Sequence, residues 1–175
     1  MSSDTLFVAL GIAVMTVSDT RDESNDSSGK FLIDALLAAG HKLAAKQIVK
    51  DDVYQIRAVM SEWIYRSDVQ AILVTGGTGF SGRDSTPEAV SVLFDKEIDG
   101  FGEVFRAISL TEIGSSTIQS RALAGLANNT VIFCVPGSTG ACKTAWHGVI
   151  SEQLDSRHRP CNFVGVLKTR QDTGI

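Results

Sequence analysis

The sequence is poor in the residues that build metal centres and disulfides. It contains three cysteines and three histidines among 175 residues. The cysteines, Cys134, Cys142 and Cys161, are odd in number and include no CxxC pair, and the histidines show no HExxH or similar spacing. This scarcity predicts reduced thiols in a cytoplasmic protein and no bound zinc.

The sequence also lacks runs of lysine or arginine, and its formal net charge is −4. Neither nucleic acid nor an anionic membrane is therefore expected as its main partner. The apolar segment 6–17 is too short to span a bilayer, and no basic residue precedes Arg21, as a signal peptide would require. We expect this segment to form a first buried strand.

Composition and periodicity predict a single domain over residues 1–175, without repeats or a linker. The apolar share of 43% and the charged share of 21% are ordinary for a globular protein. Strand-like and helix-like segments alternate, which predicts a three-layer α/β fold with a mainly parallel sheet and helices on both faces. The expected strands are 6–17, 43–49, 69–75 and 130–135; the expected helices are 28–40, 53–64, 86–94, one or two within 96–120, and one from about 141.

A glycine-rich loop, TGGTGFSGRDSTPEA at residues 75–89, follows the third expected strand. Ser85 is placed to cap the next helix with its hydroxyl, Pro87 falls in the first turn, and Glu88 completes a capping pattern. Glycines let the backbone approach a ligand closely, and free N–H groups at a helix start favour an anion. The loop predicts a site for a polyphosphate or another phosphorylated ligand.

Two known phosphate-binding motifs match this loop in part. Gly77, Gly79 and Gly82 satisfy the GxGxxG spacing of dinucleotide-binding proteins, but that motif belongs to the first strand-helix turn, with the helix starting inside it. A P-loop would carry lysine and a hydroxyl residue where Arg83 and Asp84 stand. The position and residues of the loop therefore argue against NAD binding and against a P-loop NTPase.

Arg83 and Asp84 allow two interpretations. Adjacent opposite charges at a loop are commonly a solvated pair or a weak local salt bridge. In an anion site, however, a carboxylate would repel phosphate unless it held a cation such as Mg²⁺, which prefers one or two carboxylates plus phosphate oxygens. Asp84 is therefore a candidate magnesium ligand.

A second loop, PGSTG at residues 136–140, also leads from an apolar strand to a helix start. On its own it could be an ordinary strand-helix turn. In a parallel sheet, however, the carboxyl ends of all strands share one edge, where ligands of open α/β sheets bind. Asp51 and Asp52 follow the second expected strand and emerge at the same edge, as candidates for the ligand site. The alternative interpretation is that they cap the start of the next helix.

Several segments, occurring in the same order, resemble the MoaB/Mog family of molybdenum cofactor biosynthesis proteins. They are TGGTG and RDSTPEA of the glycine-rich loop, QIVKDD at 47–52, GFGEVFR at 100–106, SSTIQSRALAG at 115–125 and VPGST at 135–139. The resemblance covers residues 12–163. The compact length and the segment RPCNF at 159–163 look most like the MoaB branch. The resemblance implies a MogA-like molybdopterin-binding fold and assembly as a homotrimer or homohexamer.

The resemblance also implies an activity, in which molybdopterin and ATP, with Mg²⁺, give adenylylated molybdopterin and pyrophosphate. By motif, the family's two functional aspartates correspond to Asp51 and Asp84. Substrate-binding segments correspond to Gly76, Gly77, Thr78, Gly79, Arg83, Pro136, Gly137 and Ser138. No Ser-His-Asp arrangement or GxSxG motif suggests covalent catalysis instead. A non-catalytic molybdopterin-binding or carrier protein of the same pathway is the alternative.

Overall fold

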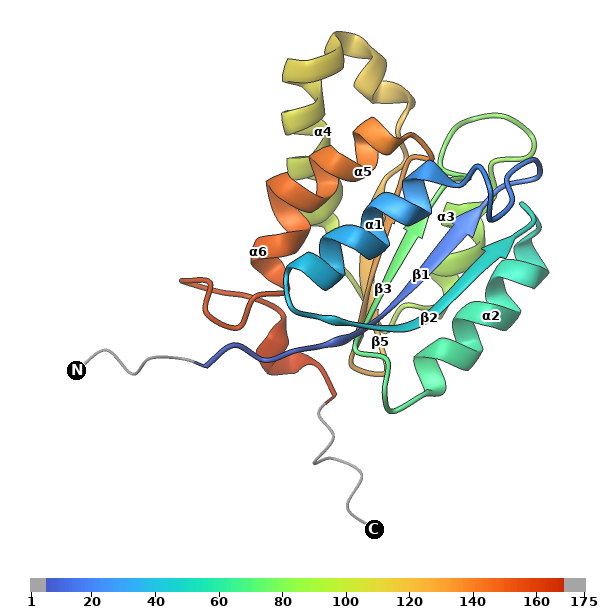
Figure 1. Ribbon diagram of the computed structural model, residues 1–175. Coiled ribbons are helices and arrows are strands. Elements are labelled where there is room, and N and C mark those ends of the chain that lie inside the picture. The colour runs from blue at the N-terminus through green and yellow to red at the C-terminus, as the bar shows by residue number, and fades with distance from the viewer. Residues whose placement is uncertain (1–5, 169–175) are drawn as a thin grey trace.

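The computed structural model describes residues 6–168, which form a six-stranded sheet with helices on both faces (Figure 1). The strands, in spatial order, are β2 (Lys42–Val49), β1 (Gly11–Val17), β3 (Ala71–Thr75), β6 (Thr130–Val135), β5 (Leu123–Ala127) and β4 (Lys96–Glu97). The first four run parallel, whereas β5 and β4 are antiparallel to their neighbours. The predicted α/β fold with a mainly parallel sheet is confirmed.

The helices cover the sheet as two outer layers. They are α1 (Ser27–Ala38), α2 (Val53–Tyr65), α3 (Thr86–Val90), α4 (Asp99–Ile113), α5 (Thr139–Ala145) and α6 (Ser151–Gln153). Helices α1, α4 and α5 pack on one face, while α2 and α3 pack on the other (Figure 1). None of the helices within 6–168 combines the length and apolar character needed to cross a membrane.

Alternation along the strands divides the interior into two cores. In β1, Ile12 and Val14 face the α1 side, and Ala13 and Met15 face the α2 side. This follows from the two-residue period of a strand, whose successive side chains point to opposite faces. All five residues of β3 are buried, as expected for a central parallel strand covered on both faces.

The first strand begins at Gly11 rather than at Leu6, so its predicted start is wrong. Residues 6–10 instead run toward the C-terminal segment, where the Val8 N–H donates to Ser156 Oγ (2.9 Å) and Ser156 donates to the Leu6 carbonyl oxygen (2.9 Å). Leu6 remains 82% exposed. The apolar run is therefore longer than the segment that the sheet buries.

Strands β5 and β4 were not predicted from the sequence. Between β5 and β6 the chain turns at Asn128 and Asn129, whose φ values are +47° and +53°. Two asparagines with positive φ suit the tight turn of an antiparallel hairpin, because asparagine tolerates the left-handed region. This turn signal is present in the sequence at the point where the sheet changes direction.

The predicted helix at 86–94 is shorter than expected. Helix α3 ends at Val90, and a 3₁₀ turn, Ser91–Leu93, continues it. In contrast, α1 and α2 lie close to their predicted bounds, and each begins at an aspartate that caps it: the Asp26 side chain accepts from the Gly29 N–H, and that of Asp52 accepts from the Tyr54 and Gln55 N–H groups. The capping interpretation thus holds for Asp52.

Candidate functional site

A polar hollow of about 280 Å³ lies at the carboxyl ends of β1, β3 and β6. The glycine-rich loop after β3 and the loop after β6 both line it, as the sheet topology predicted. The two loops touch, since a Cβ built on Gly137 would lie 3.2 Å from the Gly76 Cα. Its lining residues are Thr16, Val17, Ser18, Arg21, Thr75, Gly76, Gly77, Thr78, Gly79, Asp84, Gln119, Pro136 and Gly137.

The first two glycines of the loop adopt backbone conformations that L side chains rarely take. Gly76 has φ +105° and Gly77 has φ +66°. A Cβ on Gly76 would lie 2.1 Å from the carbonyl oxygen of Val17. Glycine is therefore required at position 76, because the loop packs directly against the end of β1.

Thr86 holds this conformation from the start of α3. Its N–H donates to the Gly77 carbonyl oxygen (2.9 Å), and its hydroxyl donates to that of Gly76 (2.9 Å). The Thr86 side chain is buried. The threonine of the RDSTPEA segment thus fixes both glycine carbonyls.

Asp51 contacts the same segment from the loop after β2. Its Oδ1 accepts hydrogen bonds from the Ser85 N–H (3.0 Å) and from the Ser85 hydroxyl. The expected capping of α3 by the Ser85 hydroxyl is therefore wrong: that hydroxyl is used by Asp51, and Glu88 pairs with Arg121 instead of completing a capping pattern. Asp51 is buried and is not among the residues that line the hollow.

Asp84 does line the hollow, and its side chain folds back onto its own loop. Its Oδ2 accepts from the Ser81 N–H (2.8 Å). Hydrogen bonding from Ser81 lowers the pKa of the Asp84 carboxyl, outweighing the opposing effect of partial burial. Asp84 therefore presents a carboxylate, rather than a carboxylic acid, to the hollow at neutral pH.

Arg83 does not pair with its neighbour Asp84. Its Nε and Nη2 donate to the Asp19 carboxylate at 2.9 and 2.7 Å, and the Arg83 side chain is 65% exposed. The interpretation of residues 83 and 84 as a local salt bridge is thus wrong, because a carboxylate from the β1–α1 loop offers Arg83 a two-pronged contact. Arg83 lies beside the hollow and is not part of its lining.

The second loop is held in place by neighbouring elements. Thr75 Oγ1 donates to the Pro136 carbonyl oxygen (3.1 Å), and Ser28 Oγ donates to that of Gly137 (2.8 Å). Ser138 caps α5, since its hydroxyl accepts from the Ala141 N–H (3.1 Å). Of the three residues proposed in this loop, Pro136 and Gly137 line the hollow and Ser138 starts the helix.

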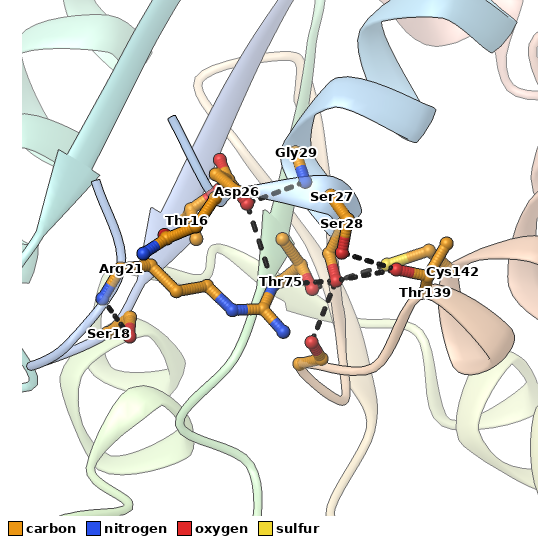
Figure 2. A network of polar contacts seen from close by, with 12 residues as sticks. Thr16, Ser18, Arg21, Asp26, Ser27, Ser28, Gly29, Thr75, Thr139 and Cys142 are labelled. Atoms are coloured by element: carbon orange, nitrogen blue, oxygen red, sulfur yellow. Dashed lines mark hydrogen bonds and ion pairs between the residues drawn. The ribbon is translucent and has the colours of Figure 1, made fainter. Parts of the chain in front are cut away.

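Two arginines at the site were not predicted from the sequence. Arg121 donates from Nε to the Gly79 carbonyl oxygen (2.7 Å) and from Nη2 to that of Asp84 (2.7 Å). It therefore links Gly79 and Asp84, the residues that flank the segment 80–83 of the glycine-rich loop. Arg21 belongs to a polar network around the start of α1, which includes Thr16, Asp26, Ser28 and Thr139 (Figure 2).

The donor chemistry fits a magnesium ion that arrives with a nucleotide. Within the described part of the chain, no group of three or more His, Cys, Asp or Glu side chains is placed to hold a metal ion. Magnesium, however, is usually bound through one or two carboxylates together with substrate phosphates. Asp84 offers one carboxylate at the hollow, which suits that mode.

Comparisons with known proteins agree in fold and family. A family model described as a probable molybdopterin binding domain matches residues 13–156. The chain is 55% identical over 164 residues to molybdenum cofactor biosynthesis protein B of Escherichia coli strain K12, covering 94% of this chain and 96% of that protein. A crystal structure of a molybdenum cofactor biosynthesis protein B superposes with a TM-score of 0.82 at 45% identity, covering 84% and 92% of the two chains. A MogA structure superposes with a TM-score of 0.74 at 25% identity, covering 82% and 97%.

Proposed function

The chain belongs to the MoaB family of molybdenum cofactor biosynthesis proteins, and from this premise we propose that it adenylylates molybdopterin with Mg-ATP. In the proposed reaction an oxygen of the substrate phosphate bonds to the α-phosphorus of ATP. The bond from that phosphorus to the α–β bridging oxygen breaks, and pyrophosphate leaves. The family membership supports a role in making the cofactor and binding molybdopterin, while the transfer itself is our proposal.

One observation carries the proposal: the glycine-rich loop offers unused backbone donors next to a carboxylate. The N–H groups of Gly77 and Thr78 donate to no residue within 6–168, and both residues line the hollow together with Asp84. Free N–H groups in such a loop bind phosphate oxygens. A site of this kind suits a charged phosphate chain.

The residues present are those that this chemistry needs. Adenylyl transfer requires positioning and charge stabilisation more than a covalent nucleophile. In our proposal the loops at Gly76–Gly79 and Pro136–Gly137 position the phosphates, and Asp51 fixes the loop end through Ser85. Magnesium, when bound with the nucleotide, would offset the charge of the phosphates, and Asp84 would hold it.

A carrier protein without turnover is the second candidate, and the position of Asp51 favours it. Oδ1 of Asp51 is occupied by Ser85, and Asp51 lies outside the lining of the hollow. Among the described residues, the lining of the hollow is thus left with a single carboxylate, that of Asp84. One carboxylate is the lower end of what magnesium sites use.

Assembly as a homotrimer or homohexamer, in the cytoplasm, completes the proposal. Apolar side chains near the end of α4 support an interface between copies. Leu110 is 54% exposed, Ile113 is 55% exposed, and Ile118 in the following turn is 68% exposed. Closed cyclic assembly is the usual way in which identical chains cover such surfaces.

The deciding experiment incubates the purified protein with molybdopterin and Mg-ATP and follows adenylylated molybdopterin by mass spectrometry and pyrophosphate by a coupled assay. Both products are expected in equal amounts. An ATP analogue with a methylene group between the α- and β-phosphates is the control, since its bond from the α-phosphorus to the bridging carbon is not cleaved in this reaction. Molybdopterin binding without product would select the carrier, and binding of neither ligand would overturn both functions.

A further inference from the structure

Arg21 is the one cation among the described residues that line the hollow, and Asp84 is the one anion. Arg21 lies in the β1–α1 loop, and its side chain is 29% exposed. It shares the lining with the glycine-rich loop and Gly137, although it is far from both in sequence. A half-buried guanidinium at an anion site raises the question of what it binds.

Two residues fix the orientation of the Arg21 side chain: Ser28 in the first turn of α1 and Asp26, which caps that helix. Nη1 donates to Ser28 Oγ (2.7 Å) and lies 3.6 Å from Asp26 Oδ1 (Figure 2). The Asp26 side chain is only 1% exposed. A buried carboxylate must be paired or fully hydrogen-bonded, so this contact holds the guanidinium at the wall of the hollow.

Two further hydrogen bonds fix the position of the Asp26 carboxylate. Its Oδ2 accepts from the Thr16 hydroxyl (2.7 Å), and its Oδ1 accepts from the Gly29 N–H (2.9 Å). A Cβ on Gly29 would lie 2.2 Å from Asp26 Oδ2 and 2.6 Å from Thr16 Oγ1, so the carboxylate and the hydroxyl pack directly against the helix start. The support of Arg21 is therefore rigid.

The other two nitrogens of the guanidinium have no hydrogen-bond partner among the residues that the structure describes. Nε and Nη2 of Arg21 donate to none of residues 6–168. Such a pair of donors forms a fork that matches two oxygens of one phosphate group. The same network reaches the second loop, because Ser28 Oγ donates to the Gly137 carbonyl oxygen (2.8 Å).

We propose that Arg21 forms a phosphate subsite in the hollow, where Nε and Nη2 bind two oxygens of a phosphate group. The subsite shares the hollow with Asp84, which is opposite in charge, and with Gly77 and Thr78, whose N–H groups are available to the same ligand. As a part of the reaction it rests on the proposed function. The phosphate belongs either to ATP or to the phosphate group of molybdopterin, and the shared chemistry is a phosphate with at least two free oxygens.

The test compares the wild type with Arg21→Gln and Arg21→Lys by calorimetric titration of three ligands: tripolyphosphate, Mg-ATP and molybdopterin. Arg157→Gln is the matched control, since Arg157 also pairs with an aspartate, Asp155 (2.8 Å), but is not part of the hollow lining. Loss of a charge-assisted contact should weaken binding roughly tenfold to a hundredfold. Lysine keeps the charge without the fork, so Arg21→Lys should bind at an intermediate strength.

The ligand that is weakened identifies the source of the phosphate. Weaker tripolyphosphate and Mg-ATP binding with unchanged molybdopterin binding assigns the subsite to the nucleotide, and the reverse assigns it to the pterin substrate. The salt dependence of the affected affinity should also become shallower in Arg21→Gln, because one fewer cation contacts the ligand.

Two results would overturn the subsite: equal affinities of wild type and Arg21→Gln for all three ligands, or no binding of any of them to the wild type. If Arg21→Gln does not fold, as judged by its thermal transition, wild-type affinities in Arg21→Lys overturn it instead. The tripolyphosphate titration needs no turnover, so a failure to form adenylylated product leaves this test intact.

Discussion

The Asp51 carboxylate accepts two hydrogen bonds from Ser85, one from its N–H at 3.0 Å and one from its hydroxyl. This contact ties the loop after β2 to the end of the glycine-rich loop, one residue beyond Asp84. The two aspartates that the sequence singled out therefore differ in position. Asp51 is buried behind the loop, and Asp84 lines the hollow.

Asp84→Asn is expected to retain molybdopterin binding and to lose adenylyl transfer. An asparagine oxygen can still accept the Ser81 N–H, so the loop keeps its shape, while the negative charge at the hollow is gone. Turnover should fall on the order of a hundredfold or more, the scale seen when one preorganised electrostatic group is lost. Turnover and pterin affinity of the variant are the two measurements.

Asp34→Asn serves as the control for Asp84→Asn, because Asp34 lies on the exposed side of α1 and its carboxylate pairs with Lys30 at 2.6 Å, away from the hollow. It should match the wild type in both measurements. Wild-type turnover in Asp84→Asn would reject a catalytic role for that carboxylate.

Gly76→Ala is expected to destabilise the protein, whereas Gly82→Ala in the same loop is not. Alanine at 76 would have to adopt φ +105° with its Cβ 2.1 Å from the Val17 carbonyl oxygen, while a Cβ at 82 meets no atom within 4 Å. The backbone strain alone costs about 1–3 kcal/mol, and the steric overlap adds to it. Urea denaturation of the two variants measures the difference, and equal midpoints would contradict the observed loop conformation.

Arg121→Ala is expected to loosen the glycine-rich loop. It removes the hydrogen bonds to the carbonyl oxygens of Gly79 and Asp84, together with the ion pair to Glu88. We expect a loss of roughly 1–3 kcal/mol in unfolding free energy and faster hydrogen exchange at residues 77–84. Arg121→Lys should rescue little, because an ammonium group cannot reach three separated acceptors as a guanidinium does.

Glu88→Gln separates the two parts of that effect. It removes the charge of the partner and leaves both carbonyl contacts of Arg121 in place. Hydrogen exchange of the loop should then stay near the wild-type rate. Fast hydrogen exchange of the loop in Glu88→Gln, with slow exchange in Arg121→Ala, would contradict the role that we give to the two carbonyl contacts of Arg121.

Stability is expected to fall as the pH drops below about 6.5, the ordinary pKa of histidine. Burial lowers the pKa of His41 in the folded protein, and Nδ1 of this residue accepts from the Leu10 N–H (3.2 Å). As the pH falls, His41 therefore takes up a proton in the unfolded chain before it does so in the folded chain. The contribution of neutral His41 to the free energy of unfolding is complete above this pH and declines below it. Urea midpoints at pH values on both sides of 6.5 test this, and His41→Asn should show a smaller change.

The mass in solution is expected to be a multiple of three chains. Light scattering at micromolar concentration measures it directly. Ile113→Lys should shift the assembly toward smaller species, because this exposed apolar residue on α4 would carry a charge into the proposed interface. A monomeric wild type would contradict the assembly, without bearing on the hollow of a single chain.

Much of the fold could be read from the sequence, because it depends on local patterns. The buried run of β3, the apolar stripes of α1 and α2, and the glycines before α3 all act over a few residues. The two glycine-containing loops were assigned to one edge of the sheet from the parallel topology alone, and the structure places them in contact. The sequence motifs also identified the family.

Only the tertiary structure decided which side chains meet at the site. Asp51 joins Ser85, Arg83 joins Asp19 rather than its neighbour Asp84, and Arg121 reaches the glycine-rich loop from a distant segment. Arg21 stood in a polar loop with no motif of its own, and it becomes part of the hollow because Asp26 and Ser28 hold it there. Such pairs depend on strand register and on the path of each loop, so the order of residues along the chain does not contain them in any local pattern.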